Sequence, residues 1–322
     1  MSELSAKAVV FEQPERLAIR TVALQPPAPT DVVVDIQYSG ISTGTERLLW
    51  TGAMPEFPGM GYPLVPGYES IGVVIDAGSE SGCAAGDTVF VPGARCFVGV
   101  NGLFGGAASR VVVAGSRVLP VSETLGADGV LLALAATAHH ALQAPAGAGE
   151  ALPELIVGHG VVGRLLARLT QALSPPGSEP VRIWERDINR RHDPKGLAAI
   201  DPAEDERRDY HLIIDASGDA DLLDTLIGRL GHGGEIVLAG FYHRRPSFDF
   251  PAAFIREIRL RVAAQWQRGD LEAVRGMVET KQLGLDGLIT HRTDADQAES
   301  AYLTAFGDSA CLKMILDWRG VQ

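Results

Sequence analysis

The clearest chemical pattern in the chain is a set of three glycines, spaced as Gly158-x-Gly160-x-x-Gly163. An apolar run at residues 155–157 precedes them and indicates a buried strand, and residues 161–173 follow with a helical pattern. In such a unit the first glycine permits a tight turn and the second lets the backbone approach a pyrophosphate, while the third lets helix and strand pack closely. The start of a helix also favours an anion. The pattern therefore predicts a dinucleotide-binding site.

Glu185 supports this prediction, because it ends the next strand-like run and stands 22 residues beyond Gly163. A carboxylate there can accept hydrogen bonds from both ribose hydroxyls of the adenosine. It would repel a 2′-phosphate, so NAD is the expected cofactor. Arg186 leaves NADP open, since guanidinium groups bind that phosphate. The other residues expected at the cofactor lie at the helix start, on the preceding helix and in loops after later strands: Val161, Val162, Thr137, Ala216, Ser217, Gly218 and Phe241.

The elements that position this site change character along the chain. Residues 7–119 contain short β-branched runs bounded by Gly and Pro, which indicates a compact β-barrel-like domain. Residues 125–142 predict a helix, and after residue 154 strand-like and helix-like runs alternate. This alternation predicts βαβ units and a parallel sheet, so the fold class is α/β. The loops after the later strands are expected near the ligand, although ordinary turns would look the same.

Composition excludes several other classes of protein. The 40 acidic against 28 basic residues give a formal charge of −12, which disfavours nucleic acid and anionic lipid as partners. Three widely spaced cysteines make a disulfide framework or a four-thiolate zinc site improbable. The longest apolar stretch, residues 130–138, is far shorter than the ~20 residues of a membrane span. Residues 1–7 show no signal-peptide pattern, so a cytoplasmic location is expected.

The order of these parts resembles the medium-chain dehydrogenase/reductase superfamily. The resemblance covers essentially the whole chain, and its markers are PGYESIG at 66–72, AGDTV at 85–89 and TAHHAL at 137–142. It implies a GroES-like β-barrel-type catalytic domain at residues 1–122 and a Rossmann dinucleotide-binding domain at 123–290. A return to the catalytic domain is implied for residues 291–322.

The chain departs from the zinc-binding members of this superfamily. Where they have Gly-His-Glu, this sequence has Gly67-Tyr68-Glu69, and the nearest match to their cysteine ligand is Ser42. Phenol and hydroxyl groups are poor substitutes for imidazole and thiolate as zinc ligands, so no metal is expected. Adjacent helical side chains diverge by about 100°, which argues against a shared site at His139 and His140.

The amino-acid sequence around these positions is similar to that of one branch of the superfamily. The similar runs are residues 40–46, 50–52 and 61–70. The branch is implied to oxidise the 3-(1-hydroxyethyl) group of a bacteriochlorophyllide to 3-acetyl in bacteriochlorophyll biosynthesis, with a chlorin as its substrate. The alternatives are a zinc-free quinone or enoyl reductase and a non-enzymatic dinucleotide-binding member.

Without a metal, the reaction needs a protein group that collects the alcohol proton. The candidates take the places of the family's metal-site segment: Tyr68, Glu69, Ser42 and Thr45. Glu69 could instead form only structural hydrogen bonds, and Tyr68 could only pack. Residues 48–66 form an aromatic and apolar stretch, which suits the binding of a flat apolar ring. The candidate substrate residues in it are Trp50, Phe57, Met60 and Tyr62. The same stretch could also be a well-packed surface loop.

A homodimer is also expected. Residues 257–265 alternate apolar and basic side chains and come last in the predicted strand order of the Rossmann domain. An edge strand tends to be paired or covered. In the superfamily that the chain resembles, the corresponding strand commonly pairs with its symmetry mate.

Overall fold

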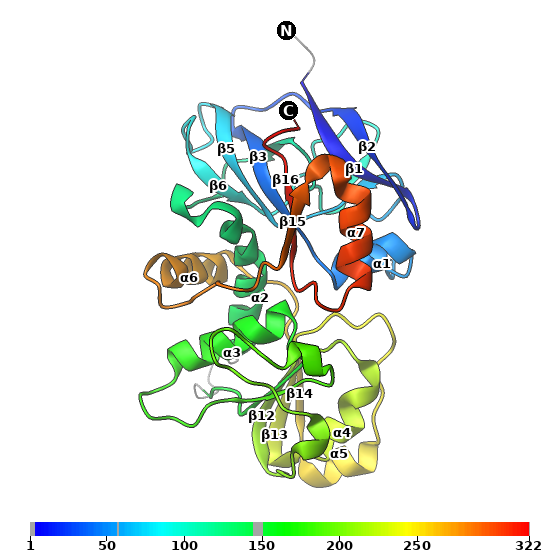
Figure 1. Ribbon diagram of the computed structural model, residues 1–322, viewed down its shortest axis with the longest axis vertical. Helices are drawn as coiled ribbons and strands as arrows, with labels where there is room; N and C mark the ends of the chain where they lie inside the picture. Colours follow the sequence, from blue (N-terminus) through cyan, green and yellow to red (C-terminus); the bar gives the residue numbers. More distant parts are fainter. Residues whose placement is uncertain (1–3, 57, 144–150, 322) are drawn as a thin grey trace. The chain divides into compact units, whose positions relative to one another are not determined.

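The computed structural model describes residues 4–56, 58–143 and 151–321. The chain forms two compact units (Figure 1): unit 1 contains Met1–Ala133 and Leu288–Gln322, and unit 2 contains Leu134–Gly287. The first boundary lies inside an apolar helical stretch, beyond the position 122/123 expected from the sequence. The second lies close to the expected position 290/291.

Unit 1 is a barrel-like arrangement of two sheets. Both sheets are mainly antiparallel, and the β-branched runs of the sequence form their buried strands: Val32, Val33 and Val34 are at most 3% exposed. One sheet has the order β2 (Arg16–Ala23), β1 (Ser5–Gln13), β4 (Leu64–Val65) and β7 (Asn101–Gly102). The other runs β15 (His291–Asp294), β16 (Met314–Asp317), β3 (Asp31–Ile41), β5 (Ser70–Ala77), β6 (Thr88–Val91) and β9 (Leu119–Pro120), with β8 (Arg110–Ala114) paired to β3.

The C-terminal segment belongs to this unit. Strand β16 pairs antiparallel with β3, with Met314 opposite Ile41. Helix α7 (Ala298–Gly307) packs against β2, β15 and β16. The other helices of unit 1 are α1 (Thr45–Thr51) and the 3-10 helices η1 (Glu123–Leu131) and η5 (Ala295–Gln297).

Unit 2 contains one parallel sheet, as the alternating pattern predicted. Its order is β11 (Arg182–Trp184), β10 (Leu155–Val157), β12 (Tyr210–Asp215), β13 (Leu230–Leu238) and β14 (Arg259–Val262). The residues of β10 are at most 3% exposed, which is typical of a strand covered on both faces. The helices are α2 (Leu132–Leu142, which begins in unit 1), α3 (Val161–Leu173), α4 (Leu223–Ile227), α5 (Phe250–Arg256) and α6 (Arg268–Glu279). The described residues of unit 2 also form the 3-10 helices η2 (Ile188–Arg190), η3 (Pro202–Glu204) and η4 (Ala220–Leu222).

The predicted helix at 125–142 differs in its first half. Residues 123–131 form the 3-10 helix η1, and Gly126 interrupts it with a φ of +51°. By length and composition alone, Glu123–Leu142 could cross a membrane. In this fold, however, every residue from Val130 to Ala136 is at most 8% exposed, so the stretch is a core element.

Candidate active site

The predicted catalytic residues lie where three strands of unit 1 begin or end. Ser42 follows β3, and Glu69 comes directly before β5. The two strands are antiparallel, with Ser39 opposite Ser70, so the end of one meets the start of the other. Strand β16 pairs with the opposite edge of β3, which brings Lys313 to the same place.

Tyr68 is the centre of a cluster of hydroxyl groups. Its phenol oxygen lies 2.7 Å from the Ser42 hydroxyl oxygen, and the nearby Thr45 side chain acts, like Ser42, to lower the pKa of the phenol. Burial, and then the negative charge of Glu69, raise the pKa of Tyr68 well above its ordinary value of 10.0. The phenol therefore keeps its proton at neutral pH. The structure thus brings together three of the four predicted catalytic residues.

Glu69, the fourth, forms a buried ion pair that the sequence reading missed. Lys313 donates from Nζ to Glu69 Oε2 at 2.6 Å and to the Ile41 carbonyl at 3.2 Å. Both side chains are at most 1% exposed. A Cβ on Gly40 would stand 2.6 Å from the Glu69 carboxylate, so a glycine is required there. The signal that could have revealed Lys313 is a lysine in an apolar strand, because lysine is almost never buried unless paired.

Glu46 holds the loop that carries Ser42. Its carboxylate accepts from the Ser42 N–H at 3.0 Å and from the Tyr302 phenol at 2.7 Å. Burial raises its pKa from 4.5 to about 7, against the effect of these hydrogen bonds. Glu46 and Tyr302 are both fully buried, and neither was predicted as part of the site.

These residues do not fit a zinc ion. At the positions of the family's ligands, Ser42 and Tyr68 bond to each other, and the Glu69 carboxylate bonds to Lys313. Neutral hydroxyl groups are weak ligands for Zn²⁺. Across residues 4–56, 58–143 and 151–321, no group of three or more His, Cys, Asp or Glu side chains could hold a metal.

His139 and His140 bind the same acidic residue. Their Nδ1 atoms lie 2.7 and 2.9 Å from the two carboxylate oxygens of Asp270. A carboxylate offers two separate acceptors, so it can join neighbouring side chains that leave a helix in different directions. Asp270 also accepts from the Gln267 N–H and completes the capping box of α6. The three side chains therefore connect α2 to α6.

The three predicted substrate residues that the structure describes do not form one surface. Trp50 is 8% exposed, and its ring lies 5.5 Å from that of Phe11 and 6.4 Å from that of Phe306. This is a correction, because Trp50 belongs to the core of unit 1 and has no open face for a ligand ring. Met60 and Tyr62 pack partly buried against that core, and the Tyr62 phenol donates to the Leu49 carbonyl. Phe57 lies outside the described residues.

The glycine turn of unit 2 has the geometry that a pyrophosphate needs. Gly158 has a φ of +92°, and a Cβ there would stand 3.1 Å from the backbone of Ser217. A Cβ on Gly163 would stand 1.8 Å from the Gly158 carbonyl oxygen. Gly160 faces open space and begins α3, with no side-chain cap on the helix. The first amides of α3, including those of Val161 and Val162, therefore suit an anionic ligand.

The loops after β10, β12 and β13 lie against one another at the carboxyl ends of these strands. A Cβ on Gly218 would stand 2.9 Å from the Phe241 carbonyl oxygen, and one on Gly240 would stand 2.6 Å from the Gly218 nitrogen. The buried Asp215 fixes them by accepting from the Ser217 N–H at 2.8 Å and from the Tyr242 phenol at 2.6 Å. The sequence analysis missed Tyr242.

Two further predicted cofactor residues have separate positions. Ala216 donates from its N–H to the Val157 carbonyl at 2.9 Å, which joins its loop to β10. Thr137 lies partly buried on α2, and its part in cofactor binding stays a prediction.

Glu185 is tied to the glycine turn. It accepts from the His159 N–H at 3.0 Å and from the Asp187 N–H at 2.9 Å. The His159 ring is buried and donates from Nδ1 to the Arg190 carbonyl at 2.7 Å. Burial and the nearby charge of Arg164 lower its pKa to about 4, so the imidazole is neutral. His159 therefore supports the turn from within and offers no charge to a ligand.

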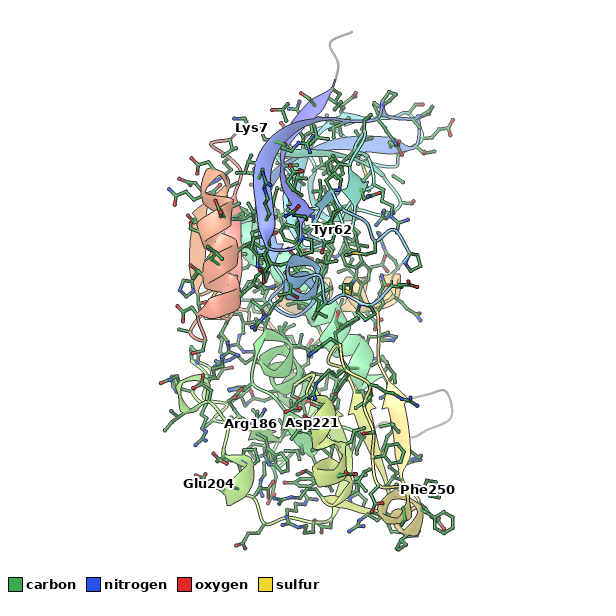
Figure 2. All side chains as sticks on the ribbon, turned by 90° about the vertical axis from the view of Figure 1, so that its right-hand side faces the viewer. Lys7, Tyr62, Arg186, Glu204, Asp221 and Phe250 are labelled. Atoms are coloured by element: carbon green, nitrogen blue, oxygen red, sulfur yellow. The ribbon has the colours of Figure 1, made fainter. Side chains whose placement is uncertain are left out.

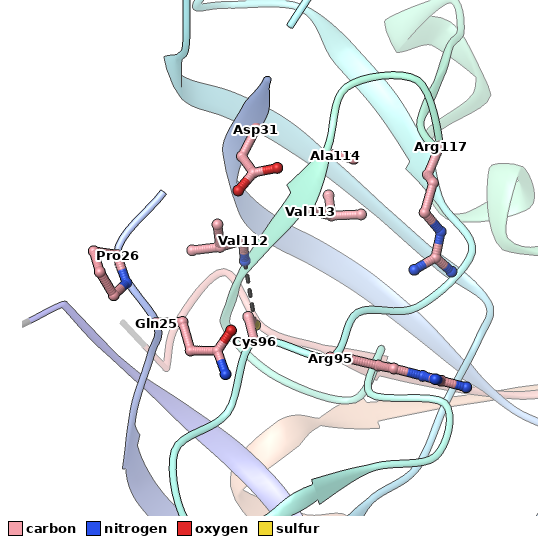
Figure 3. A pocket seen from close by; sticks show the side chains of 9 residues that line it. All are labelled: Gln25, Pro26, Asp31, Arg95, Cys96, Val112, Val113, Ala114 and Arg117. Atoms are coloured by element: carbon pink, nitrogen blue, oxygen red, sulfur yellow. Dashed lines mark hydrogen bonds between the residues drawn. The ribbon is translucent and has the colours of Figure 1, made fainter. Parts of the chain in front are cut away.

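A separate hollow on unit 1 contains none of the predicted site residues (Figure 3). Its volume is about 170 Å³, and it is lined by Gln25, Pro26, Asp31, Arg95, Cys96, Val112, Val113, Ala114 and Arg117. Cys96 accepts a hydrogen bond from the Val112 N–H at 3.3 Å. Burial raises the pKa of this thiol, so it is a structural thiol and a poor ligand.

Comparison with known proteins identifies close relatives over the full length. Residues 28–123 match the alcohol dehydrogenase GroES-like domain. The chain is 55% identical to the 2-desacetyl-2-hydroxyethyl bacteriochlorophyllide A dehydrogenase of Rhodobacter capsulatus, over 99% of this chain and 100% of that protein. It is 54% identical to the protein of the same name from Cereibacter sphaeroides, over 97% of this chain and 98% of that protein.

Solved structures share the fold at lower identity. A putative zinc-binding dehydrogenase from Sinorhizobium meliloti bound to NADP matches with a TM-score of 0.79 and 20% identity, over 98% of this chain and 100% of that one. A short chain alcohol dehydrogenase (rspB) from Escherichia coli CFT073, complexed with NADH, matches with a TM-score of 0.80 and 20% identity, over 97% and 99% of the two chains. These matches show that the two units together have the dehydrogenase fold.

Proposed function

We infer that this chain, which belongs to the bacteriochlorophyllide a dehydrogenases of the medium-chain dehydrogenase/reductase superfamily, oxidises the 3-(1-hydroxyethyl) group of a bacteriochlorophyllide to 3-acetyl. The observation that carries this proposal is the identity above one half, over nearly the whole chain, to two proteins named for that substrate. The reaction belongs to bacteriochlorophyll a biosynthesis, and the chlorin alcohol is the small-molecule substrate.

The proposed cofactor is NAD. A nicotinamide dinucleotide supplies the acceptor for the hydride that leaves the alcohol carbon. The glycine turn, the uncapped start of α3 and the three adjoining loops support binding of its pyrophosphate. Glu185 supports NAD over NADP, because its carboxylate already lies at the turn, where it would meet the ribose hydroxyls and repel a 2′-phosphate.

The proposed proton-handling group is the hydroxyl cluster of Tyr68, Ser42 and Thr45. Because its raised pKa keeps the phenol protonated, Tyr68 does not act as a phenolate base. It instead takes part in a relay: as it accepts the alcohol proton, its own proton passes to the Ser42 hydroxyl 2.7 Å away, and the Ser42 proton passes in turn to solvent water. Glu69 is a positioning residue in this scheme, since its carboxylate is engaged by Lys313.

The oxidation is proposed to proceed without zinc. The support is the chemistry of the side chains at the family's ligand positions, where two hydroxyl-bearing residues bond to each other. The conjugated macrocycle next to the reacting carbon can delocalise the positive character that develops as hydride leaves. This reduces what a metal would have to contribute.

A homodimer is proposed through the edge of the parallel sheet. Strand β14 ends the sheet order, and its Leu260 and Val262 side chains are 42% and 69% exposed. Phe254 and Ile255, on the preceding helix, are 68% and 72% exposed. An apolar edge strand beside exposed apolar side chains favours pairing with a second copy.

The experiment that tests the proposed function supplies the purified chain with a 3-(1-hydroxyethyl) bacteriochlorophyllide and NAD, and follows the nicotinamide absorbance. Deuterium at the reacting carbon should appear at C4 of the reduced cofactor. Parallel assays offer NADPH or NADH with quinones and enoyl substrates. Turnover of these alone would replace the proposal with a reductase, and cofactor binding without any turnover would indicate a non-enzymatic member.

A further inference from the structure

Two arginines near the proposed ribose site are held by acidic residues of the loop after β12. Arg186, next to Glu185, donates from Nη2 to Asp219 Oδ2 at 2.9 Å. Arg244 pairs with Asp221 at 2.6 Å and lies 3.8 Å from Asp219. Figure 2 labels Arg186 and Asp221 on unit 2. The basic groups that could attract a phosphate are thus already paired with carboxylates.

The Arg186–Asp219 pair lies in the loops at the carboxyl ends of two strands, on either side of the glycine turn. Strands β11 and β12 lie on either side of β10, whose carboxyl end carries the glycine turn. Arg186 comes from the loop after β11, and Asp219 comes from the loop after β12. Their ion pair therefore connects the two loops that flank the glycine turn, and Arg186 directly follows Glu185 in the chain.

We propose that Asp219 is a cofactor-specificity residue, which holds the Arg186 guanidinium away from a 2′-phosphate and so maintains the preference for NAD. This inference rests on the proposed dinucleotide-dependent function. Guanidinium groups bind phosphate through paired hydrogen bonds, so a released Arg186 is the group that NADP requires. Arg186 is 71% exposed and can reorient once its partner is gone.

A neighbouring arginine does not offer the same route. Arg191 donates from Nε to the Glu185 carbonyl at 2.9 Å and pairs with Asp201. Its guanidinium is therefore engaged in fixing the loop after β11. The Arg186–Asp219 contact is therefore the one that a change at Asp219 would release for a 2′-phosphate, in addition to the effect of Glu185.

The variant Asp219→Asn tests the inference with little risk to the fold. Asp219 Oδ1 accepts from the Asp221 N–H at 3.1 Å, and an asparagine retains that acceptor while it removes the charge. Dissociation constants for NADH and NADPH are measured by nicotinamide fluorescence. Binding of NADPH should tighten roughly tenfold, while that of NADH should change by less than about threefold. Asp219→Glu retains the charge and should keep the parental ratio.

Asp221→Asn is the matched control, because it makes the same change of charge two residues away and removes the shorter ion pair of Arg244, while it leaves the Arg186–Asp219 pair in place. It should leave the ratio of the two constants within about twofold of the parent. In the double variant Arg186→Ala/Asp219→Asn the gain for NADPH should disappear. An unchanged ratio in Asp219→Asn, or a gain that persists in the double variant, would overturn the inference.

This experiment separates the inference from the proposed function. It contains no chlorin, so a wrong substrate does not affect its result. A parental chain that prefers NADPH would contradict both the choice of NAD and the inference, because Asp219 would then have no preference for NAD to maintain. A parental chain that binds neither nucleotide would contradict both.

Discussion

Lys313 Nζ lies 2.6 Å from Glu69 Oε2, and the ion pair joins residues 244 positions apart in the chain. Both side chains are almost completely shielded from water. A buried pair of this kind is favourable only while both charges are present, because each alone would face a large desolvation cost. The contact therefore makes the position of the segment before β5, which contains Tyr68 and Glu69, depend on the C-terminal segment that contains Lys313.

Replacing Lys313 with methionine should destabilise the protein by about 3–5 kcal/mol, because Glu69 would remain as an uncompensated buried charge. The double variant Lys313→Met/Glu69→Gln should recover a large part of this loss. The free energy of unfolding of the full chain, measured in urea, provides the test. Lys195→Met, which removes an exposed pair with Asp286, is the control and should cost at most about 1 kcal/mol. A similar small cost at Lys313 would show that the buried pair contributes little.

Tyr68→Phe should lower turnover on the order of 10²-fold, because it removes the oxygen that handles the proton and keeps the ring. The Michaelis constant for NAD should change little, since Tyr68 does not belong to the glycine turn. Steady-state kinetics with the chlorin alcohol provides the measurement. Tyr38→Phe is the control, because the Tyr38 hydroxyl bonds to Arg292 at 3.3 Å and belongs to another cluster. Full activity of Tyr68→Phe would move the proton-handling role elsewhere.

Removal of metal ions should leave oxidation of the chlorin alcohol unchanged. The hydroxyl groups of Ser42 and Tyr68 bond to each other, and neither is a strong zinc ligand. The assay compares protein before and after treatment with a chelator, and elemental analysis measures zinc per chain. Stoichiometric zinc whose loss abolishes activity would contradict the proposed metal-independent reaction.

Glu46→Gln should remove a pH-dependent part of the stability. The folded-state pKa of Glu46 is about 7 against 4.5 ordinarily, so between these values the folded protein holds a proton that the unfolded chain has lost. This contribution is complete below about pH 4.5 and is lost as the pH rises through about 7. The stability of the parent relative to Glu46→Gln should fall by roughly 2–3 kcal/mol from about pH 5 to about pH 8. Denaturant unfolding at both pH values measures the difference, and the exposed Glu80→Gln should show no such trend.

Val262→Lys should weaken the proposed dimer, because it places a charge on the exposed edge strand β14. Light scattering or sedimentation at micromolar concentration should show a dimer for the parent and a shift toward monomer for the variant. Val98→Lys changes a valine of similar exposure, 54% against 69%, on unit 1 and should leave the dimer intact. A parental chain that is monomeric under these conditions would rule out the proposal.

The parts of the structure that the sequence predicted depend on local patterns. The glycine turn is local, since Gly158, Gly160 and Gly163 and their flanking strand and helix lie within one short segment. Lys313 was missed because its role depends on the pairing of β16 with β3, which no local pattern encodes. Trp50 was misassigned because the sequence of a loop-like segment does not show whether an aromatic side chain faces a ligand or the core. The hydroxyl cluster was found only through the resemblance to a family, because Ser42 and Tyr68 stand at two of the positions where its zinc-binding members have metal ligands.

The pairing of β16 with β3 also has a consequence for how the chain is made. Unit 2 is continuous and is fully synthesised once residue 287 has left the ribosome, so it can fold while the chain is still growing. Unit 1 must wait, with the first strands of its larger sheet already formed and one edge of β3 open, until residues 314–317 emerge. During this interval Glu69 has no lysine beside it. The open edge of β3 is therefore available for pairing with other strands until synthesis of the C-terminal segment is complete.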